Sequence, residues 1–487
     1  MEPLKVWFLS PEVAPFAKTG GLADVAGSLP GALKKIGVET SVGLPFYRVA
    51  KEGDFTVTQV LSGLEVPMGD DALSCRVWGA ETEEGIPVYF FDREDLFDRP
   101  NLYGTSDGDY YDNLERFSFL CRAALCFAQK AGLRMDVIHC HDWQTGLVPL
   151  YLRTVYRDDP FFSGTASLFT IHNIGYQGLF PPGKLRISGI PSSEYQPEGV
   201  EYWGQISLLK AGIVYSDAVT TVSPRYSVEI QSREFGLGME GILSKRAHVL
   251  HGILNGADYS LWDPSTDRHL VYAYSPGDME GKARGKLDLL RETGLDQGLL
   301  TQPLFGVISR LSAQKGCDLI LEVAPEAVKE GAGLLILGAG EEVYEKALGG
   351  LQEEYPGRIA VKLGFDEALA HRIMAGADML LIPSLYEPCG LTQMYALRYG
   401  TVPLVRATGG LEDTVTPFDP ATGQGNGFKF TSYDARDFLQ AIRQAVRTFH
   451  DAPLWRRLVS NGMKADFSWN RSAQRYVEIY RSLLASP

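Results

Sequence analysis

Short apolar runs alternate with amphipathic stretches along the whole chain, a pattern that predicts strands followed by helices. Predicted helices occupy residues 22–36, 111–130, 317–329, 369–375 and 391–399. Regular alternation of strands and helices indicates parallel sheets covered on both faces, so we predict an α/β fold with doubly wound sheets. The predicted strands are residues 5–9, 40–44, 88–91, 137–141, 166–171 and 218–222 in a first series, and 304–308, 333–337, 359–363, 379–383 and 402–405 in a second.

The two series of strands are separated by residues 251–267, which are rich in Gly, Asn, Asp and Pro and have little periodicity. A chain of 487 residues is too long for one ordinary core. We therefore predict two doubly wound domains of similar size, an N-terminal domain at 1–250 and a second domain that begins at 251.

The composition excludes several classes of protein. A formal net charge of −14 opposes binding to nucleic acid, which requires clustered cations. No stretch approaches the roughly 18 apolar residues of a membrane helix, and residues 1–16 lack a signal-peptide cleavage site, so we expect a cytoplasmic protein with no membrane partner. The six cysteines show no CxxC spacing, and HCHD at 139–142 is a weak metal motif, so we expect no metal and no cofactor.

The segment SLYEPCGLTQMYALRYG, at 384–400, follows a predicted buried strand and leads into a predicted helix. Ligands of open α/β sheets bind beyond the carboxyl ends of the strands, where free N–H groups at helix N-termini attract phosphate. Glu387 is therefore our first candidate to meet a phosphorylated substrate. The alternative is an ordinary carboxylate at a helix N-terminus, stabilised by the helix dipole.

Cations follow two other strands. Lys18 precedes Gly20 and Gly21, which let the backbone approach a ligand at the start of a helix, although a glycine turn with a solvated lysine explains them equally well. Arg310 and Lys315 straddle a turn, where Arg suits a pyrophosphate by bidentate bonding and Lys as a compact charge. The alternative is an exposed surface pair with acidic partners.

Polar and aromatic residues follow strands of the first series. Asp142 in HCHDWQTG and His172 in TIHNIGYQG are expected to point toward the same ligand site. Trp143, Tyr176 and Tyr103 offer apolar faces to sugar rings, although a single aromatic residue is more often part of the core.

Three glycine turns follow strands of the second series. LGAGEE has Val343 where a dinucleotide fingerprint has its third glycine, so binding of NAD is a poor interpretation. Gly364 and Phe365 lie where a nucleoside could pack, and the glycine pair at 409–410 is either a phosphate cradle or a tight turn.

Taken together, PEVAPFAKTGGLADV, NLYGTSDGDYYDNLERF, HCHDWQTGL, TIHNIGYQG, GILNGAD, SRLSAQKG, SLYEPCGLTQMYALRYGTVPLVRATGGLEDTV and DFSWNRSAQRYVEIY resemble bacterial glycogen synthase and plant starch synthase. The resemblance covers nearly the whole chain in the family's order. It implies a GT-B fold, in which two Rossmann-like domains face each other across a cleft. The second domain would span 251–468, and a closing segment at 469–487 would cross back to the first domain. It also implies a hexosyltransferase that transfers glucose from ADP-glucose to the non-reducing end of an α-1,4-glucan with retention of configuration, in glycogen or starch biosynthesis.

The resemblance also implies roles for single residues of the first domain. Lys18 would lie at the donor phosphates, with Gly20 and Gly21, while Asp142 and His172 contact the donor glucose. Asn255, in the linker, would also reach the sugar. The residues expected to line the cleft on the acceptor side are Glu12, Asp24, Tyr103, Trp143 and Tyr176.

In the second domain, the resemblance implies that Arg310 and Lys315 hold the pyrophosphate and that Glu387 meets the glucose 3-hydroxyl and the distal phosphate. The expected catalytic residues are thus Glu387, Asp142, His172, Arg310 and Lys315. The other donor-binding residues of this domain are Gly364, Phe365, Cys389, Gly390, Leu391 and Thr392.

One position departs from the wider pattern of retaining transferases, in which a second Glu follows the first after seven residues. Here that position is Tyr395, which puts a second carboxylate at the ribose in doubt. Two alternatives to an ADP-glucose-dependent synthase stay open. One is another retaining GT-B transferase with UDP-glucose and a different acceptor, and the other is a non-catalytic protein that binds a glucan or a sugar nucleotide.

Overall fold

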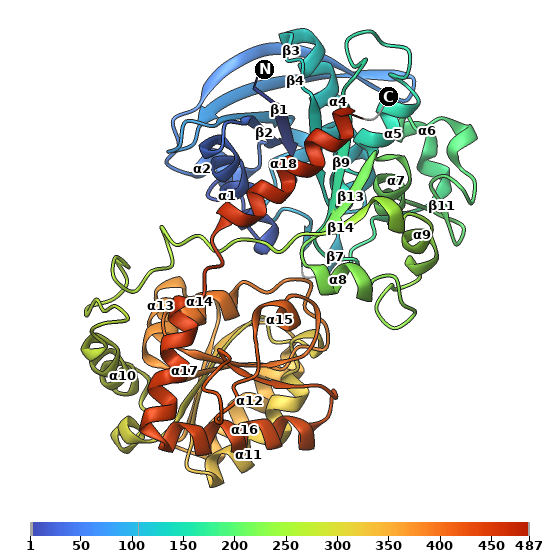
Figure 1. Ribbon diagram of the computed structural model, residues 1–487. Helices are drawn as coiled ribbons and strands as arrows, with labels where there is room; N and C mark the ends of the chain where they lie inside the picture. Colours follow the sequence, from blue (N-terminus) through green and yellow to red (C-terminus); the bar gives the residue numbers. More distant parts are fainter. Residues whose placement is uncertain (1–2, 106, 486–487) are drawn as a thin grey trace. The chain divides into compact units, whose positions relative to one another are not determined.

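The computed structural model describes residues 3–105 and 107–485. The start of the predicted domain at 1–250 and the end of the predicted segment at 469–487 therefore lie outside the described residues. The chain forms two compact units, shown in Figure 1. Unit 1 contains the residues up to Gly256 together with those from Trp469, and unit 2 is Ala257–Ser468.

Unit 1 is built on a nine-stranded sheet of order β14-β13-β9-β8-β1-β2-β5-β4-β3. The seven strands from β14 to β5 are parallel. The chain leaves β1 toward β2 on one side and later returns to β8 on the other, so β1 and β8 flank the topological switch point. The strands are β1 Lys5–Leu9, β2 Glu39–Pro45, β3 Thr58–Met68, β4 Asp71–Glu81, β5 Pro87–Asp92, β8 Val137–His141, β9 Ala166–Ile171, β13 Ala218–Thr221 and β14 Leu250–Gly252.

The antiparallel hairpin β3–β4 corrects the expectation of purely parallel sheets. The hairpin forms because only a tight turn at Gly69 and Asp70 separates the two strands, whereas a parallel pair needs a long crossover. Leu64, Val66 and Met68 alternate with exposed residues, which is the period-2 signal of a half-buried strand.

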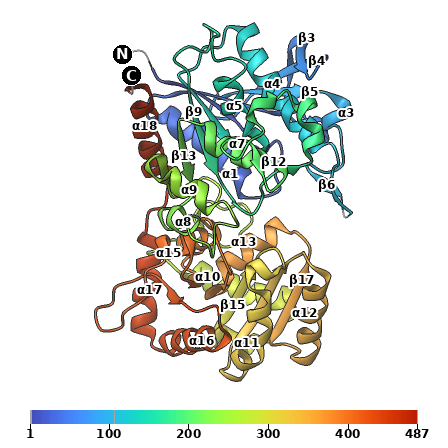
Figure 2. The ribbon, with the colours of Figure 1, turned by 90° about the vertical axis from the view of Figure 1, so that its right-hand side faces the viewer.

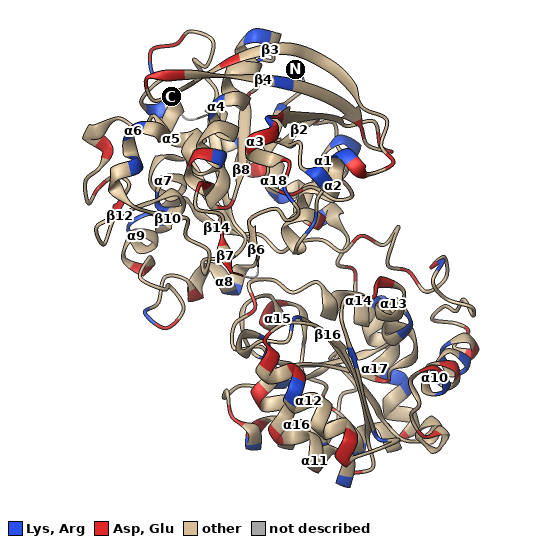
Figure 3. Cartoon of the chain, turned by 180° about the vertical axis from the view of Figure 1, so that it is seen from behind, with Lys and Arg blue, Asp and Glu red and all other residues tan. Residues whose placement is uncertain are grey.

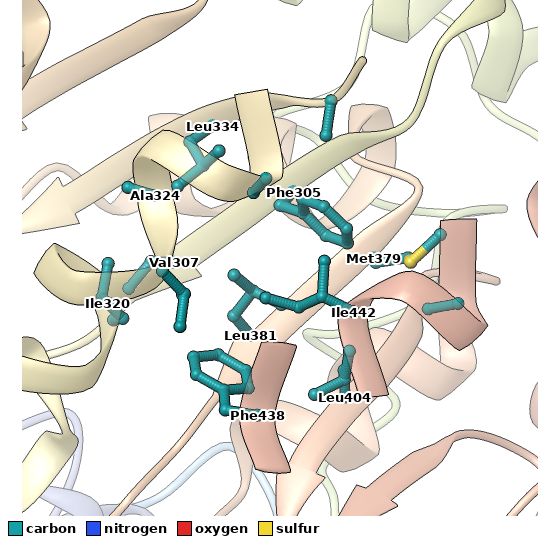
Figure 4. Packing of buried hydrophobic residues seen from close by; sticks show 14 of the residues in the cluster. Phe305, Val307, Ile320, Ala324, Leu334, Met379, Leu381, Leu404, Phe438 and Ile442 are labelled. Atoms are coloured by element: carbon teal, nitrogen blue, oxygen red, sulfur yellow. The ribbon is translucent and has the colours of Figure 1, made fainter. Parts of the chain in front are cut away.

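Unit 2 is built on a six-stranded parallel sheet of order β17-β16-β15-β18-β19-β20, with the switch point between β15 and β18. Phe305, Leu381 and Leu404 point from its strands into a core that Phe438 and Ile442 of α16 complete (Figure 4). The strands are β15 Leu304–Ile308, β16 Gly333–Gly338, β17 Ile359–Leu363, β18 Met379–Ile382, β19 Val402–Arg406 and β20 Phe428–Phe430.

Helices cover both sheets. Those of unit 1 are α1 Gly21–Lys35, α2 Arg48–Glu52, α3 Glu94–Phe97, α4 Asn113–Ala131, α5 Leu147–Arg153, α6 Leu185–Ser188, α7 Leu208–Tyr215, α8 Pro224–Glu229, α9 Glu240–Lys245 and α18 Trp469–Ala485. Those of unit 2 are α10 Glu280–Thr293, α11 Cys317–Lys329, α12 Glu342–Glu354, α13 Glu367–Gly376, α14 Thr392–Arg398, α15 Gly409–Thr414, α16 Ala435–His450 and α17 Ala452–Lys464. The remaining short strands are β6 Gly104–Thr105, β7 Gly108–Asp109, β10 Leu179–Phe180, β11 Glu201–Tyr202 and β12 Gln205–Ser207.

The last helix, α18, packs within unit 1 beside α1 (Figure 2). Its Tyr480 hydroxyl is 2.8 Å from Nδ1 of His139 on β8, and the ring of Tyr476 also packs on His139. At the start of α18, Trp469 packs so closely on Gly256 that a side chain at position 256 would collide with it. The C-terminal helix thus completes the core of the N-terminal unit.

Charged residues are interspersed along the surface helices. Figure 3 shows basic and acidic positions mixed on α10 and α12 of unit 2. No helix in the described ranges is long and apolar enough to cross a lipid bilayer.

Candidate functional site

Glu387 and Lys315 form an ion pair at the switch point of unit 2. Lys315 lies between β15 and α11, and Glu387 lies in the turn between β18 and α14. The Lys315 ammonium is 2.6 Å from Oε2 of Glu387, and the Ser384 hydroxyl donates to the same oxygen at 2.9 Å. These three residues line a pocket together with Gly390 and Thr392.

Lys315 and its acidic partner are both largely buried. The Lys315 side chain is 19% exposed and that of Glu387 is 10% exposed. The alternative interpretation of an exposed surface pair therefore does not describe Lys315, whose acidic partner is Glu387, the first candidate to meet a phosphorylated substrate. Gly316, with φ of 74°, brings this turn against β18, because a Cβ atom there would lie 2.3 Å from the Pro383 carbonyl oxygen. Arg310 is exposed, and its guanidinium donates to Gln314 at 3.2 Å.

The Glu387 turn is held by close backbone contacts with the glycine pair at 409–410. The Gly410 amide donates to the Glu387 and Pro388 carbonyls, both at 3.2 Å. A Cβ atom at Gly409 would lie 1.9 Å from the Glu387 carbonyl oxygen. These glycines therefore let the two segments touch, which supports the tight-turn interpretation of that motif.

Gln393 fixes the other end of the same turn. It is fully buried, and its amide donates to the Cys389 carbonyl at 3.1 Å and the Gly390 carbonyl at 2.8 Å. Gly390 has a φ of 69°, a conformation that favours glycine. Leu391 is the N-terminal cap of α14, so Thr392 begins that helix at the pocket.

The turn after β17 is open to solvent. Gly364 has a φ of 118° and Phe365 is 89% exposed, so the aromatic ring is available to pack against a flat ligand. Tyr395 differs, because it is 8% exposed and its ring stacks on Trp262 at 4.3 Å. Position 395, where the wider pattern of retaining transferases has its second glutamate, is thus part of an aromatic stack.

In unit 1, Glu12 organises the glycine loop after β1. Its carboxylate accepts hydrogen bonds from the Thr19 hydroxyl at 2.6 Å, the Tyr103 hydroxyl at 2.6 Å and the Gly20 amide at 3.3 Å. It is 5% exposed, which suits a residue that positions the loop. Lys18, in the same loop, is half exposed.

The helix that follows this loop begins at Gly21. Asp24, in its first turn, is 2.6 Å from the Lys18 ammonium. The charge of Lys18 is therefore partly balanced within unit 1.

Asp142 and His172 meet at the ends of β8 and β9. Asp142 accepts a hydrogen bond from the His172 amide at 2.7 Å, and it has a φ of 57°, a strained value for a residue with a side chain. Nε2 of His172 is 2.9 Å from Nδ1 of His141. Burial raises the pKa of Asp142 to about 7 and lowers that of His172 to about 3, so His172 is neutral at physiological pH.

The remaining candidates of unit 1 differ in exposure. Trp143 is 7% exposed and packs against Phe117 at 5.1 Å, which supports a core role for its ring. Tyr176 is 51% exposed. Asn255 follows β14 and is buried, and its Oδ1 has no hydrogen-bond partner among the described residues.

Comparison with known proteins places this arrangement in a family. Residues 5–245 match the starch synthase catalytic domain, and residues 296–464 match glycosyl transferases group 1. The chain is 46% identical to a glycogen synthase of Koribacter versatilis over 98% of both chains, and 42% identical to one of Thermotoga maritima over 99% of both. The chain belongs to the glycogen and starch synthase family. The resemblance seen in the sequence motifs is confirmed.

A solved structure supports the same assignment of fold. The catalytic domain of starch synthase IV from Arabidopsis thaliana, bound to ADP and acarbose, matches with a TM-score of 0.93 and 33% identity over 99% of this chain and 100% of that one. The predicted GT-B fold is confirmed for this family member. A sucrose-phosphate synthase from Thermosynechococcus elongatus, 18% identical over 99% of this chain and all of its own, has the same fold with a TM-score of 0.61.

Several residues that build the candidate site were not predicted from the sequence. Ser384 and Gln393 hold the Glu387 turn, and Arg406, which is 9% exposed, donates to the Leu385 carbonyl. His141 contacts His172 but was considered only as a weak metal ligand. Buried polar side chains at the carboxyl ends of strands were the available signal, because such groups require partners.

The buried histidines of unit 1 predict loss of stability in acid. Burial lowers the pKa of His139, His141 and His172. Their contribution to folding stability is therefore present above the histidine pKa of the unfolded chain, about 6.5, and is lost as the pH falls below that value. Asp142 has the opposite effect because its pKa is raised, so its contribution to folding stability is lost as the pH rises through about 7. Because three histidines lose their contribution as the pH falls and only Asp142 gains one, the net free energy of unfolding decreases.

We therefore expect the free energy of unfolding to fall by about 2 kcal/mol between pH 7.5 and 5.5, measured by urea denaturation. His139→Gln should reduce this fall, whereas His450→Gln, at an exposed position, should leave it unchanged. An equal fall in wild type and His139→Gln would contradict the assignment.

Proposed function

We propose that this family member is a glycogen synthase that transfers glucose from ADP-glucose to the non-reducing end of an α-1,4-glucan with retention of configuration. The observation that carries the proposal is the Lys315–Glu387 pair at the switch point of unit 2. Ligands of doubly wound sheets bind at such points. The similarity to glycogen synthases extends over the whole chain, which supports the same activity. A cytoplasmic location remains a prediction.

The geometry suits the charges that develop during transfer. Breaking the bond between the anomeric carbon and the phosphate oxygen makes the sugar more positive and the departing ADP more negative. The Lys315 ammonium has three N–H donors and gives one to Glu387, which leaves two for phosphate oxygens. With Arg310 and the N-terminus of α11, it would stabilise the leaving group electrostatically.

The Glu387 carboxylate is arranged to bind the sugar. Both of its observed hydrogen bonds, from Lys315 and Ser384, reach Oε2. Oε1 accepts no hydrogen bond from the described residues. We therefore assign Oε1 as the atom that accepts a hydrogen bond from a glucose hydroxyl. This role explains why a carboxylate lies beside the proposed phosphate site.

A donor screen tests the proposal. Purified protein is incubated with glycogen and either ADP-glucose or UDP-glucose, and release of the nucleoside diphosphate is followed. We expect turnover with ADP-glucose and a much lower rate with UDP-glucose. Faster turnover with UDP-glucose would favour the other transferase, and no turnover with either would favour a binding protein.

We also expect turnover to persist in excess EDTA. In this account Arg310 and Lys315 offset the charge of the pyrophosphate, so transfer requires no bound metal. The rate of ADP release should be the same before and after chelation. Loss of activity that magnesium restores would contradict this assignment of roles.

A further inference from the structure

A second cluster of polar side chains lies in unit 2, outside the residues assigned to glucosyl transfer. His269, Glu367 and His371 place one ligand atom each within 4.8 Å of one another. Glu367 and His371 are four residues apart on α13, so they share one face of that helix. His269 comes from the segment that leads from unit 1 into the second sheet.

Asp267 positions both histidines. Its Oδ2 lies 2.7 Å from Nδ1 of His371, and its Oδ1 accepts from the His269 amide at 2.8 Å. A carboxylate bonded to one ring nitrogen of a histidine fixes the tautomer and leaves the other nitrogen as a metal ligand. The Tyr399 hydroxyl, 2.6 Å from Oδ2, holds the aspartate in turn.

The His371 ring is held rigidly. It is 3% exposed and stacks on Trp262 with 3.7 Å between ring centroids and 11° between planes. The opposite partner of Trp262 is Tyr395, stacked at 4.3 Å. His371 is buried and fixed, whereas His269 is more exposed and Glu367 is exposed. A metal ion can therefore reach these three side chains.

We propose that His269, Glu367 and His371 bind one divalent transition-metal ion of the Zn²⁺ type. Two imidazoles and one carboxylate suit zinc better than calcium or magnesium, which prefer oxygen ligands. Bonds of about 2.0–2.1 Å bring neighbouring ligand atoms to about 3–3.5 Å, and rotation of the exposed Glu367 side chain closes that distance. The ion would join the segment around His269 to α13 and stabilise unit 2, independently of glucosyl transfer.

Zinc titration of the full chain tests the proposal. Protein freed of metal by chelation and dialysis is titrated with ZnCl₂ in a calorimeter, and with CoCl₂ to record the visible absorption of bound cobalt. We expect one equivalent of each metal in the wild type. Glu367→Gln and His269→Ala should each weaken binding at least about tenfold, since even a residue behind a ligand contributes about 10–100-fold. Asp267→Asn should weaken it by about 10–100-fold.

His450→Ala, which removes a histidine on α16 of the same unit, is the matched control and should bind zinc as the wild type does. Zinc should also raise the thermal unfolding midpoint of the wild type but not that of Glu367→Gln, because only a bound ion stabilises the folded state. No saturable binding, or binding of wild-type affinity in both Glu367→Gln and His269→Ala, would overturn the proposal.

Discussion

Glu387→Gln is expected to lower turnover about 10²–10³-fold while ADP still binds. Glutamine has the size of glutamate and still accepts a hydrogen bond from Ser384, but it removes the charge beside Lys315. If that charge stabilises the sugar only in the transition state, chemistry is lost and binding is kept. Initial rates with ADP-glucose and calorimetric titration with ADP measure the two effects separately.

Glu330→Gln is the matched control for this substitution. Glu330 is also an ion-paired carboxylate of unit 2, 2.8 Å from Arg443, and it does not line the pocket. Its turnover should equal that of the wild type. Near-normal turnover of Glu387→Gln would refute the role of this carboxylate.

Lys315→Ala is expected to weaken ADP binding about 10–100-fold. A hydrogen bond to a charged group contributes about 1.5–3 kcal/mol, and each 1.4 kcal/mol changes a dissociation constant tenfold. The substitution also leaves Glu387 without its cation, so turnover should fall together with binding. Calorimetry with ADP and initial rates at saturating donor measure both effects.

Lys329→Ala provides the comparison, because Lys329 lies at the other end of α11 and pairs with Glu326 at 2.6 Å. It is 67% exposed, so its removal should change neither ADP affinity nor turnover. If Lys315→Ala binds ADP as tightly as Lys329→Ala does, the pyrophosphate lies elsewhere.

The central strands could be predicted from the sequence because they are buried on both faces. The bounds of β1, β8, β9 and β15 match the prediction, since largely apolar runs mark such strands. The bounds of β17 also match, although it is an edge strand whose last two residues are exposed. Candidate residues at their carboxyl ends followed from the same pattern, because doubly wound sheets bind ligands there. The family then came from long motifs that cover nearly the whole chain.

Contacts between distant residues could not be predicted in the same way. Lys315 and Glu387 are 72 residues apart, and only the order of strands in the sheet makes β15 and β18 neighbours. The packing of Gly409 and Gly410 on the Glu387 turn is equally non-local. The β3–β4 hairpin was missed for another reason, since its first half is exposed and shows no period.

The site of glucose addition tests the central claim most directly. Glycogen is extended with ADP-glucose labelled in the sugar, and the product is digested with an exo-acting enzyme that removes α-1,4-linked maltose from non-reducing ends. The account predicts incorporation of label and its early, complete release as maltose. No incorporation from ADP-glucose, or label that resists this digestion, would contradict it.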